Sequence, residues 1–128
     1  MNTALDKEIR LKLLKLLESE PELTQREMNH KMGVSLGKIN YCISALTEKG
    51  MIRIERFKHH RKKSAYIYRL TPKGIEELAN LTLSFLKLRI EEYNRIKEEI
   101  QSLSEEIDKM DPDLRNDPDL IRQLDSIS

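Results

Sequence analysis

The sequence predicts a mainly α fold with one small β-hairpin (α+β), followed by a long C-terminal helix. Three observations support this prediction. Apolar residues recur at helical spacing in three consecutive segments of the N-terminal part. Two short runs of β-branched and aromatic residues then flank a polar loop, which is typical of a hairpin. Helical periodicity resumes after Thr71 and continues to about Met110, longer than a globular domain normally needs.

The first predicted helix runs from Thr3 to Ser19 and ends before Pro21, because proline removes a hydrogen-bond donor and disfavours helix at the preceding residue. Leu11 and Leu14 widen its apolar surface, so we expect it to be covered on more than one side. A dimer partner is one candidate for the second cover. The main apolar face comprises Leu5, Ile9, Leu13, Leu16 and Leu17.

The second predicted helix begins with a capping box and continues to about Met32. In this motif Thr24 accepts a hydrogen bond from the backbone amide of Glu27, and the Glu27 side chain reaches back to Thr24. Gly33 then supplies the left-handed backbone conformation that a tight helix end requires.

Ser35 is expected to cap a third helix, which runs to about Lys49 and is terminated by Gly50. Its inward residues follow the spacing of one helical face. They are Ile39, Ile43 and Leu46. A helix, a tight turn and a second helix form a helix-turn-helix, in which the second helix can enter the DNA major groove.

Two strands follow, over residues 51–57 and 66–70, and the loop over residues 58–64 between them contains no apolar residue. The hairpin is densely basic, and Glu55 is its only acidic residue. A cationic hairpin tip gains affinity beside a phosphate backbone because it displaces counterions; the alternative is an ordinary solvated loop. The basic residues are Arg53, Arg56, Lys58, Arg61, Lys62, Lys63 and Arg69.

The last helix is predicted from Pro72 to about Met110, with Thr71 as its cap. Apolar residues near its C-terminal end alternate in steps of three and four, which is typical of a coiled coil that joins two copies of a chain. This predicted dimerisation seam comprises Tyr93, Ile96, Ile100, Leu103, Ile107 and Met110. The overall prediction is a winged helix-turn-helix domain (residues 1–74), a long coiled-coil dimerisation helix (75–110) and an acidic tail (111–128) with a short helix.

Charge is distributed unevenly along the 128 residues. Up to Gly74 there are 16 Lys and Arg against 8 Asp and Glu, a balance of +8, and the remainder has 7 against 14, a balance of −7. This asymmetry favours a basic nucleic-acid-binding face with an acidic appendage, although soluble lysine-rich helices would also account for the charge. No segment is apolar enough to span a membrane, and a single cysteine fits a reducing cytoplasm.

The sequence contains no motif that indicates an enzyme, a cofactor or a metal site. His59 and His60 are adjacent, so on a strand they would point to opposite faces, which is poor geometry for a shared metal. Cys42 lies beside the inward stripe of the third helix. A buried structural thiol is the simpler interpretation of Cys42, and a redox switch is the alternative.

Candidate DNA contacts come from three places in the predicted domain. In the third helix, Asn40 could pair with an adenine edge and Lys38 with a guanine edge or a phosphate. The start of the second helix could bind phosphates through its amides and side chains. The full set is Thr24, Gln25, Arg26, Ser35, Gly37, Lys38, Asn40, Tyr41, Ser44, Lys58, Arg61, Lys62 and Lys63.

Two segments, GVSLGKINYCISALTEKGMI and AYIYRLTPKGIEELA, resemble the winged-helix regulators of the MarR superfamily. SLGKINYC and TPKGIEELA are most similar to its EPS-associated branch, found near exopolysaccharide gene clusters. The resemblance implies a prokaryotic, cytoplasmic transcription regulator that dimerises and binds a near-palindromic operator. Typical members bring helices from both termini together around a ligand pocket. The short N-terminal part and the C-terminal coiled coil depart from that pattern, so no ligand residues are carried over.

We therefore predict a homodimeric, sequence-specific binder of double-stranded DNA that is associated with the nucleoid. It would need no cofactor and no membrane, and its small-molecule effector, if any, is unknown. Two alternatives stay open. A winged-helix adaptor, oligomerised by its coiled coil, would bind a protein partner and show no salt-dependent affinity for DNA. A non-specific, chromatin-like binder would bind operator and random duplex equally.

Overall fold

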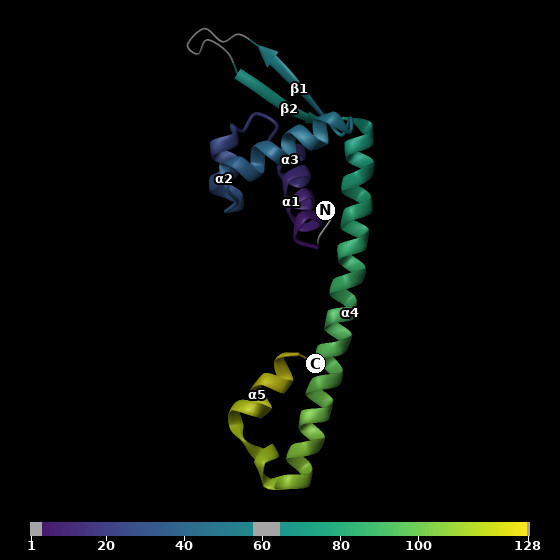
Figure 1. Cartoon of the computed structure of the whole chain (residues 1–128). Coiled ribbons are helices and arrows are strands. Elements are labelled where there is room, and N and C mark those ends of the chain that lie inside the picture. Colours follow the sequence, from purple (N-terminus) through teal and green to yellow (C-terminus); the bar gives the residue numbers. More distant parts are fainter. Residues whose placement is uncertain (1–3, 58–64, 128) are drawn as a thin grey trace. The chain divides into compact units, whose positions relative to one another are not determined.

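The computed structural model describes residues 4–57 and 65–127, and it is mainly helical with one two-stranded antiparallel hairpin, as predicted (Figure 1). The chain divides into two compact units, Met1–Phe85 and Leu86–Ser128. In chain order, the elements are α1 (Ala4–Ser19), α2 (Gln25–Met32), α3 (Leu36–Glu48), β1 (Ile52–Phe57), β2 (Ala65–Leu70), α4 (Pro72–Met110), the short 3-10 helix η1 (Pro112–Asn116) and α5 (Pro118–Ser126).

The core of the first unit is aliphatic and is built around α1. Leu13 and Leu14 point in different directions from this helix, yet both are fully buried within a single chain. Leu14 was one of the two residues predicted to widen the apolar surface of α1, and it needs no cover from a partner subunit. Leu11, the other residue, is partly buried and packs against the same core. The remaining core residues are Leu17, Leu23, Met28, Ile39, Ile43, Leu46, Ile52, Tyr68, Leu78 and Leu81.

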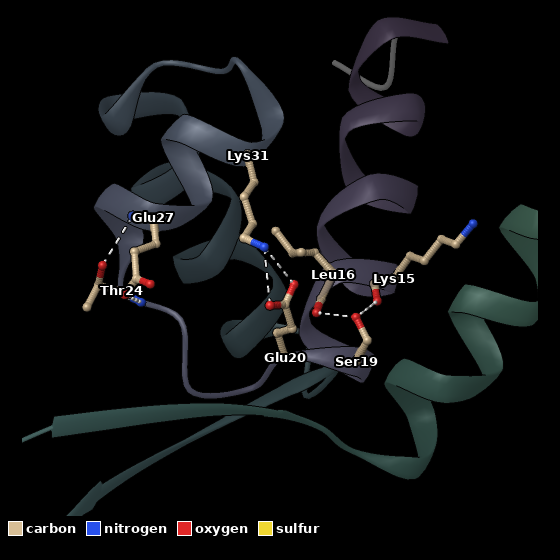
Figure 2. Close-up of polar contacts among 7 residues, drawn as sticks. All are labelled: Lys15, Leu16, Ser19, Glu20, Thr24, Glu27 and Lys31. Atoms are coloured by element: carbon tan, nitrogen blue, oxygen red, sulfur yellow. Dashed lines mark hydrogen bonds and ion pairs between the residues drawn. The ribbon is translucent and has the colours of Figure 1, made fainter.

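Polar contacts fix the turn between α1 and α2 (Figure 2). The Lys31 ammonium lies 3.2 Å from both carboxylate oxygens of Glu20, and so ties α2 to the end of α1. The predicted capping box is confirmed: the Glu27 amide donates to the Thr24 hydroxyl at 3.1 Å, and the Thr24 amide donates to the Glu27 carboxylate at 3.2 Å. These bonds satisfy amides that an uncapped helix start would leave open.

A tight turn connects α2 to α3. Gly33 ends α2 in the left-handed conformation at φ +66°, as its position predicted, and its amide donates to the carbonyl of Asn29. The Asn29 side chain in turn donates to the carbonyl of Val34 at 2.5 Å. The Ser35 hydroxyl then accepts from the amide of Lys38 at 3.1 Å and caps α3. Together these bonds fix the direction in which α3 leaves the turn.

The hairpin β1–β2 is the described part of the predicted wing; residues 58–64, between the two strands, lie outside the described ranges. β1 and β2 pair antiparallel, with Ile52 opposite Leu70 and Ile54 opposite Tyr68. Directly opposite residues share a face of the sheet. Ile52 and Tyr68 are buried, so this face joins the core near the base of the hairpin.

The beginning of α4 is attached to the base of the wing. The Thr71 hydroxyl donates to the carbonyl of Gly50 and accepts from the amide of Gly74, which confirms Thr71 as a cap. Further along α4, Glu77 forms a 2.9 Å ion pair with Arg10 of α1, and both side chains are largely shielded from solvent. This pair and the burial of Leu78 and Leu81 hold the first turns of α4 within the N-terminal unit.

In the second unit the tail folds into two capped segments. Asp111 accepts from the amide of Asp113 at the start of η1, and Asp117 accepts from the amide of Leu120 at the start of α5. The predicted short helix in the tail is confirmed as α5. Within this unit, the end of α4 and α5 enclose an open cavity of about 440 Å³ with a mostly apolar lining. The lining includes Ile100, Leu103, Ile107, Leu120, Leu124 and Ile127.

Candidate nucleic-acid interface

One side of α3 is buried and the other is open, as helical periodicity predicts. Ile39, Ile43 and Leu46 lie in the core, each with at most 4% of its surface exposed, whereas Tyr41 is 65% exposed. We call the open side, formed by Gly37, Asn40, Tyr41 and Ser44, the outer face of α3; all four residues are exposed.

The outer face presents groups that can read or contact a nucleic acid. The Ser44 hydroxyl donates to the side-chain oxygen of Asn40 at 3.3 Å, one helical turn away. Only the side-chain oxygen of Asn40 takes part in this bond, so its two side-chain N–H groups are not used in it. The bond also favours one orientation of the Asn40 side-chain amide. Nothing would lie within 4 Å of a Cβ built on Gly37, so the start of α3 is open to close approach by a ligand backbone.

Lys38 lies at the edge of this face and is held from two sides. Its ammonium is 2.9 Å from a carboxylate oxygen of Asp6 in α1 and 5.3 Å from the centre of the Tyr41 ring. A cation within about 6 Å of an aromatic face is attracted by the ring. The hydrogen bond to Asp6 raises the pKa of Lys38, and the side chain is only partly exposed. Lys38 therefore carries its charge next to an acidic partner.

The start of α2 presents a smaller polar surface. The Thr24 hydroxyl is used in the capping box, as the Ser35 hydroxyl is at α3. The side-chain amide of Gln25 donates to the Tyr68 hydroxyl of β2 at 3.4 Å, which directs Gln25 toward the wing. Arg26 is exposed. Arg26 is therefore available to a ligand at the start of α2, and Gln25 links α2 to β2.

The predicted wing contacts Lys58, Arg61, Lys62 and Lys63 lie outside the residues that the structure describes. The described part of the hairpin contains an Arg–Glu–Arg arrangement on one face. Arg53 donates to Glu55 at 2.7 Å, and Arg69, which lies opposite Arg53, donates to Glu55 at 3.1 Å. These bonds, with the Arg69 bond as the larger contribution, hold the pKa of Glu55 below its ordinary value. Glu55 thus binds both guanidinium groups, and its single negative charge offsets one of their two positive charges.

Arg56 lies on the other face of the hairpin, opposite Tyr66. Both residues are exposed, and Arg56 makes no ion pair within residues 4–57 and 65–127. Sequence reasoning counted Arg56 among the basic residues but did not single it out. Strand alternation was the signal that could have done so, because it separates Arg56 from the face that carries Glu55.

Asp6 was the other relevant residue that sequence reasoning missed. Asp6 lies in α1 and Lys38 in α3, with α2 between them in the sequence, and no periodicity or motif connects the two positions. Their proximity depends on the packing of α1 against α3, which only the tertiary structure reveals.

Most residues of the predicted dimerisation seam are exposed on α4. Tyr93, Ile96 and Leu103 are each at least 55% exposed. Ile100 and Ile107 are partly covered, because they line the cavity beside α5. The single chain thus leaves an apolar stripe along α4 open to solvent.

Other kinds of site receive no support from the described residues. They contain no group of three or more His, Cys, Asp or Glu side chains arranged to hold a metal ion. No described helix combines the length and apolar character that crossing a membrane would require. Cys42 is half-buried in α3, and this burial raises the pKa of its thiol. A neutral thiol at physiological pH fits a packing role better than a reactive one.

Comparison with known proteins agrees with this geometry. Residues 6–53 match the family model described as winged helix-turn-helix DNA-binding. The match covers most of α1, all of α2 and α3, and the beginning of β1, so the chain contains a winged helix-turn-helix domain. No curated protein sequence matches the chain.

Several solved structures share the fold at low sequence identity. The regulator BldR from Sulfolobus solfataricus aligns with a TM-score of 0.58 at 20% identity, over 80% of this chain and 73% of that one. A transcriptional regulator homologue from Pyrococcus horikoshii OT3 gives 0.54 at 20%, over 70% and 86%. MarR from Staphylococcus aureus, solved with salicylate and kanamycin, gives 0.52 at 18%, over 79% and 71%. At these sequence identities, the comparison shows that the structures share a fold.

Proposed function

We propose that this protein is a sequence-specific, double-stranded DNA-binding transcriptional regulator that acts as a homodimer on a near-palindromic operator. The observation that carries the proposal is the outer face of α3. Its polar and aromatic groups are exposed, while the opposite side of the same helix is fixed in the core. A rigidly supported helix with an exposed polar face is what the major groove accepts.

The proposed binding mode assigns different roles to α3 and the wing. α3 enters the major groove, where the Asn40 amide can donate to and accept from adenine, and Tyr41 contacts a sugar, a phosphate or a thymine methyl. Gly37 lets the start of α3 approach the duplex closely. The wing contacts the flanking backbone or minor groove through Arg56 and the basic residues of its loop. Base contacts then supply specificity, and phosphate contacts supply most of the affinity.

Dimerisation is proposed to use the exposed apolar stripe of α4. Tyr93, Ile96 and Leu103 present large apolar side chains to water in the single chain. Their spacing suits the pairing of two helices. Burying them would be favourable and would offset the entropy that two chains lose when they associate. A symmetric dimer places two copies of α3 on two half-sites separated by about 10 bp, or a multiple of that distance.

Within the winged-helix proteins, we place the chain in the MarR superfamily, and SLGKINYC and TPKGIEELA support its EPS-associated branch. A regulator of this kind works in the cytoplasm at the nucleoid and is not an enzyme. Its action requires no cofactor, since binding and release of DNA would be its whole chemistry.

Selecting bound duplexes from a random pool tests the proposal. We expect one enriched near-palindromic sequence. Asn40→Ala should then weaken discrimination at one position per half-site by about 1–3 kcal/mol while retaining affinity for random duplex. The triple change Arg61→Ala, Lys62→Ala and Lys63→Ala should instead weaken binding to every sequence and flatten its salt dependence.

The same experiment separates the alternatives. An adaptor would show no salt-dependent affinity for DNA even at low ionic strength, and a non-specific binder would enrich no sequence. Either result would overturn the proposed function. Unchanged affinity after the triple change would remove the wing from the binding mode and leave α3 as the only contact element.

A further inference from the structure

The ion pair between Asp6 and Lys38 places an acidic group at the edge of the outer face of α3. The two charged atoms are 2.9 Å apart, and 27% of the Asp6 side chain and 35% of the Lys38 side chain are exposed. The pair is more sheltered than the neighbouring Glu8–Lys12 pair of α1, which is longer, at 3.5 Å, and more exposed. Water and salt screen sheltered pairs less effectively, so the attraction between Asp6 and Lys38 is weakened less than that between Glu8 and Lys12.

The position of Lys38 on α3 determines how its ion pair with Asp6 affects contact with a duplex. At 100° per residue, Gly37, Tyr41 and Ser44 cluster on one side of α3, while Lys38 lies about a quarter-turn away, toward α1. The Tyr41 ring supports the ammonium from the outer side. Lys38 can therefore reach a duplex on the outer face only by leaving Asp6 or by sharing its charge with Asp6.

We propose that Asp6 is a specificity-determining residue that acts through Lys38: it withholds the charge of Lys38 from the phosphates of unrelated duplex. The inference rests on the proposed function. Non-specific affinity arises almost entirely from phosphate neutralisation. A carboxylate already bound to the lysine competes with each phosphate, so random DNA loses one potential contact per subunit. In the proposed binding mode, a selected site is held by base contacts from Asn40, which do not use Lys38, so competition from Asp6 weakens binding to that site less.

The test measures affinity for random and selected duplex across a range of salt concentrations. Asp6→Asn keeps the size of the side chain and removes its charge. We expect it to tighten binding to random duplex and to lower the ratio of selected to random affinity. One additional phosphate contact per subunit should also make the gain salt-dependent, shrinking it roughly threefold per subunit between about 50 and about 200 mM salt.

Two matched variants isolate the role of Lys38. Glu8→Gln makes the same charge change in α1 but releases the exposed Lys12, so it reports the general effect of removing one negative charge. In a Lys38→Ala background, Asp6→Asn should give no more than this general effect. A gain that equals that of Glu8→Gln, or one that persists without Lys38, would overturn the inference.

The result also distinguishes the inference from the function on which it rests. If the wild-type protein shows no salt-dependent binding to DNA, the proposed function fails. If the wild type binds and selects a sequence, but Asp6→Asn behaves like Glu8→Gln, only the role of Asp6 fails. Circular dichroism and thermal unfolding of each variant establish that the N-terminal unit is folded.

Discussion

A methyl group on Gly74 would collide with the backbone carbonyl oxygen of Met51, so the first turn of α4 approaches the start of the hairpin at a distance that only glycine allows. The same carbonyl accepts a hydrogen bond from the amide of Thr71 at 3.1 Å. The close contact therefore joins the wing, the cap and the long helix at one point of the N-terminal unit.

Gly74→Ala should destabilise the protein even though alanine has the higher helix propensity. Propensity alone would favour alanine by up to about 1 kcal/mol. The backbone shift needed to accommodate the methyl group should cost about 1–3 kcal/mol, and the hydrogen bond of Thr71 would be strained as well. Urea unfolding of both proteins measures the difference in the free energy of unfolding.

Gly37→Ala is the matched control, because a Cβ on Gly37 would meet open space and Gly37 lies in α3 without a positive φ. This change should leave stability unchanged or raise it by up to about 1 kcal/mol. Its effect should appear in DNA affinity instead, if the start of α3 approaches the duplex closely. Equal destabilisation by both alanines would contradict the packing argument.

Glu55 should make the stability of the wing depend on pH. Because hydrogen bonds from Arg69 and Arg53 hold its folded-state pKa below the ordinary value, its ion pairs stabilise the fold above the unfolded pKa of about 4.3. That contribution is lost as the pH falls through the lower folded-state pKa. Glu55→Gln should lower the melting temperature near neutral pH, and the difference from wild type should close at lower pH.

Glu105→Gln serves as the control for Glu55, since Glu105 is exposed on α4 and forms no ion pair within the described residues. Its melting temperature should stay close to that of wild type throughout the same pH range. The explanation is wrong if the Glu55→Gln difference is independent of pH, because the carboxylate would then not be the stabilising group.

Cys42 should react slowly with alkylating reagents in the folded protein. Burial in α3 raises the pKa of its thiol, so the nucleophilic thiolate is scarce at neutral pH. The rate of reaction with iodoacetamide should rise with pH beyond the range of a free cysteine, and it should increase when urea unfolds the chain. Rapid alkylation of the folded protein at pH 7 would instead support the redox switch.

The sequence was sufficient for features that depend on local chemistry. The capping box at Thr24 and the left-handed turn at Gly33 were both predicted from residue type and spacing, and both are present. The bounds of α4 were predicted as Pro72 to about Met110, with Thr71 as the cap, and the structure has the same bounds. In each case the physical cause acts within a few residues, where neighbouring sequence contains all the participants.

Features that depend on packing between distant segments were not predictable from one sequence. The pairing of Asp6 with Lys38 and the direction of Gln25 toward Tyr68 both require the docked positions of several elements. The burial of α1 on more than one side was predicted, but the elements that bury it were not. Periodicity shows which residues are buried and does not show which neighbouring element buries them. The assignment of α4 to dimerisation also remains a prediction, to be tested directly.

Ile96→Glu should shift the protein from dimer to monomer. Ile96 is 55% exposed in the middle of the apolar stripe of α4, so the change does not disturb the N-terminal core, but it would place a charge in the proposed pairing surface. Gln101→Glu adds the same charge at an exposed position off the seam and should leave the dimer intact. Sedimentation velocity at micromolar concentrations distinguishes the two species. A monomeric wild type, or a dimer that survives Ile96→Glu, would remove α4 as the pairing element, and the expected symmetry of the operator would lose its structural basis.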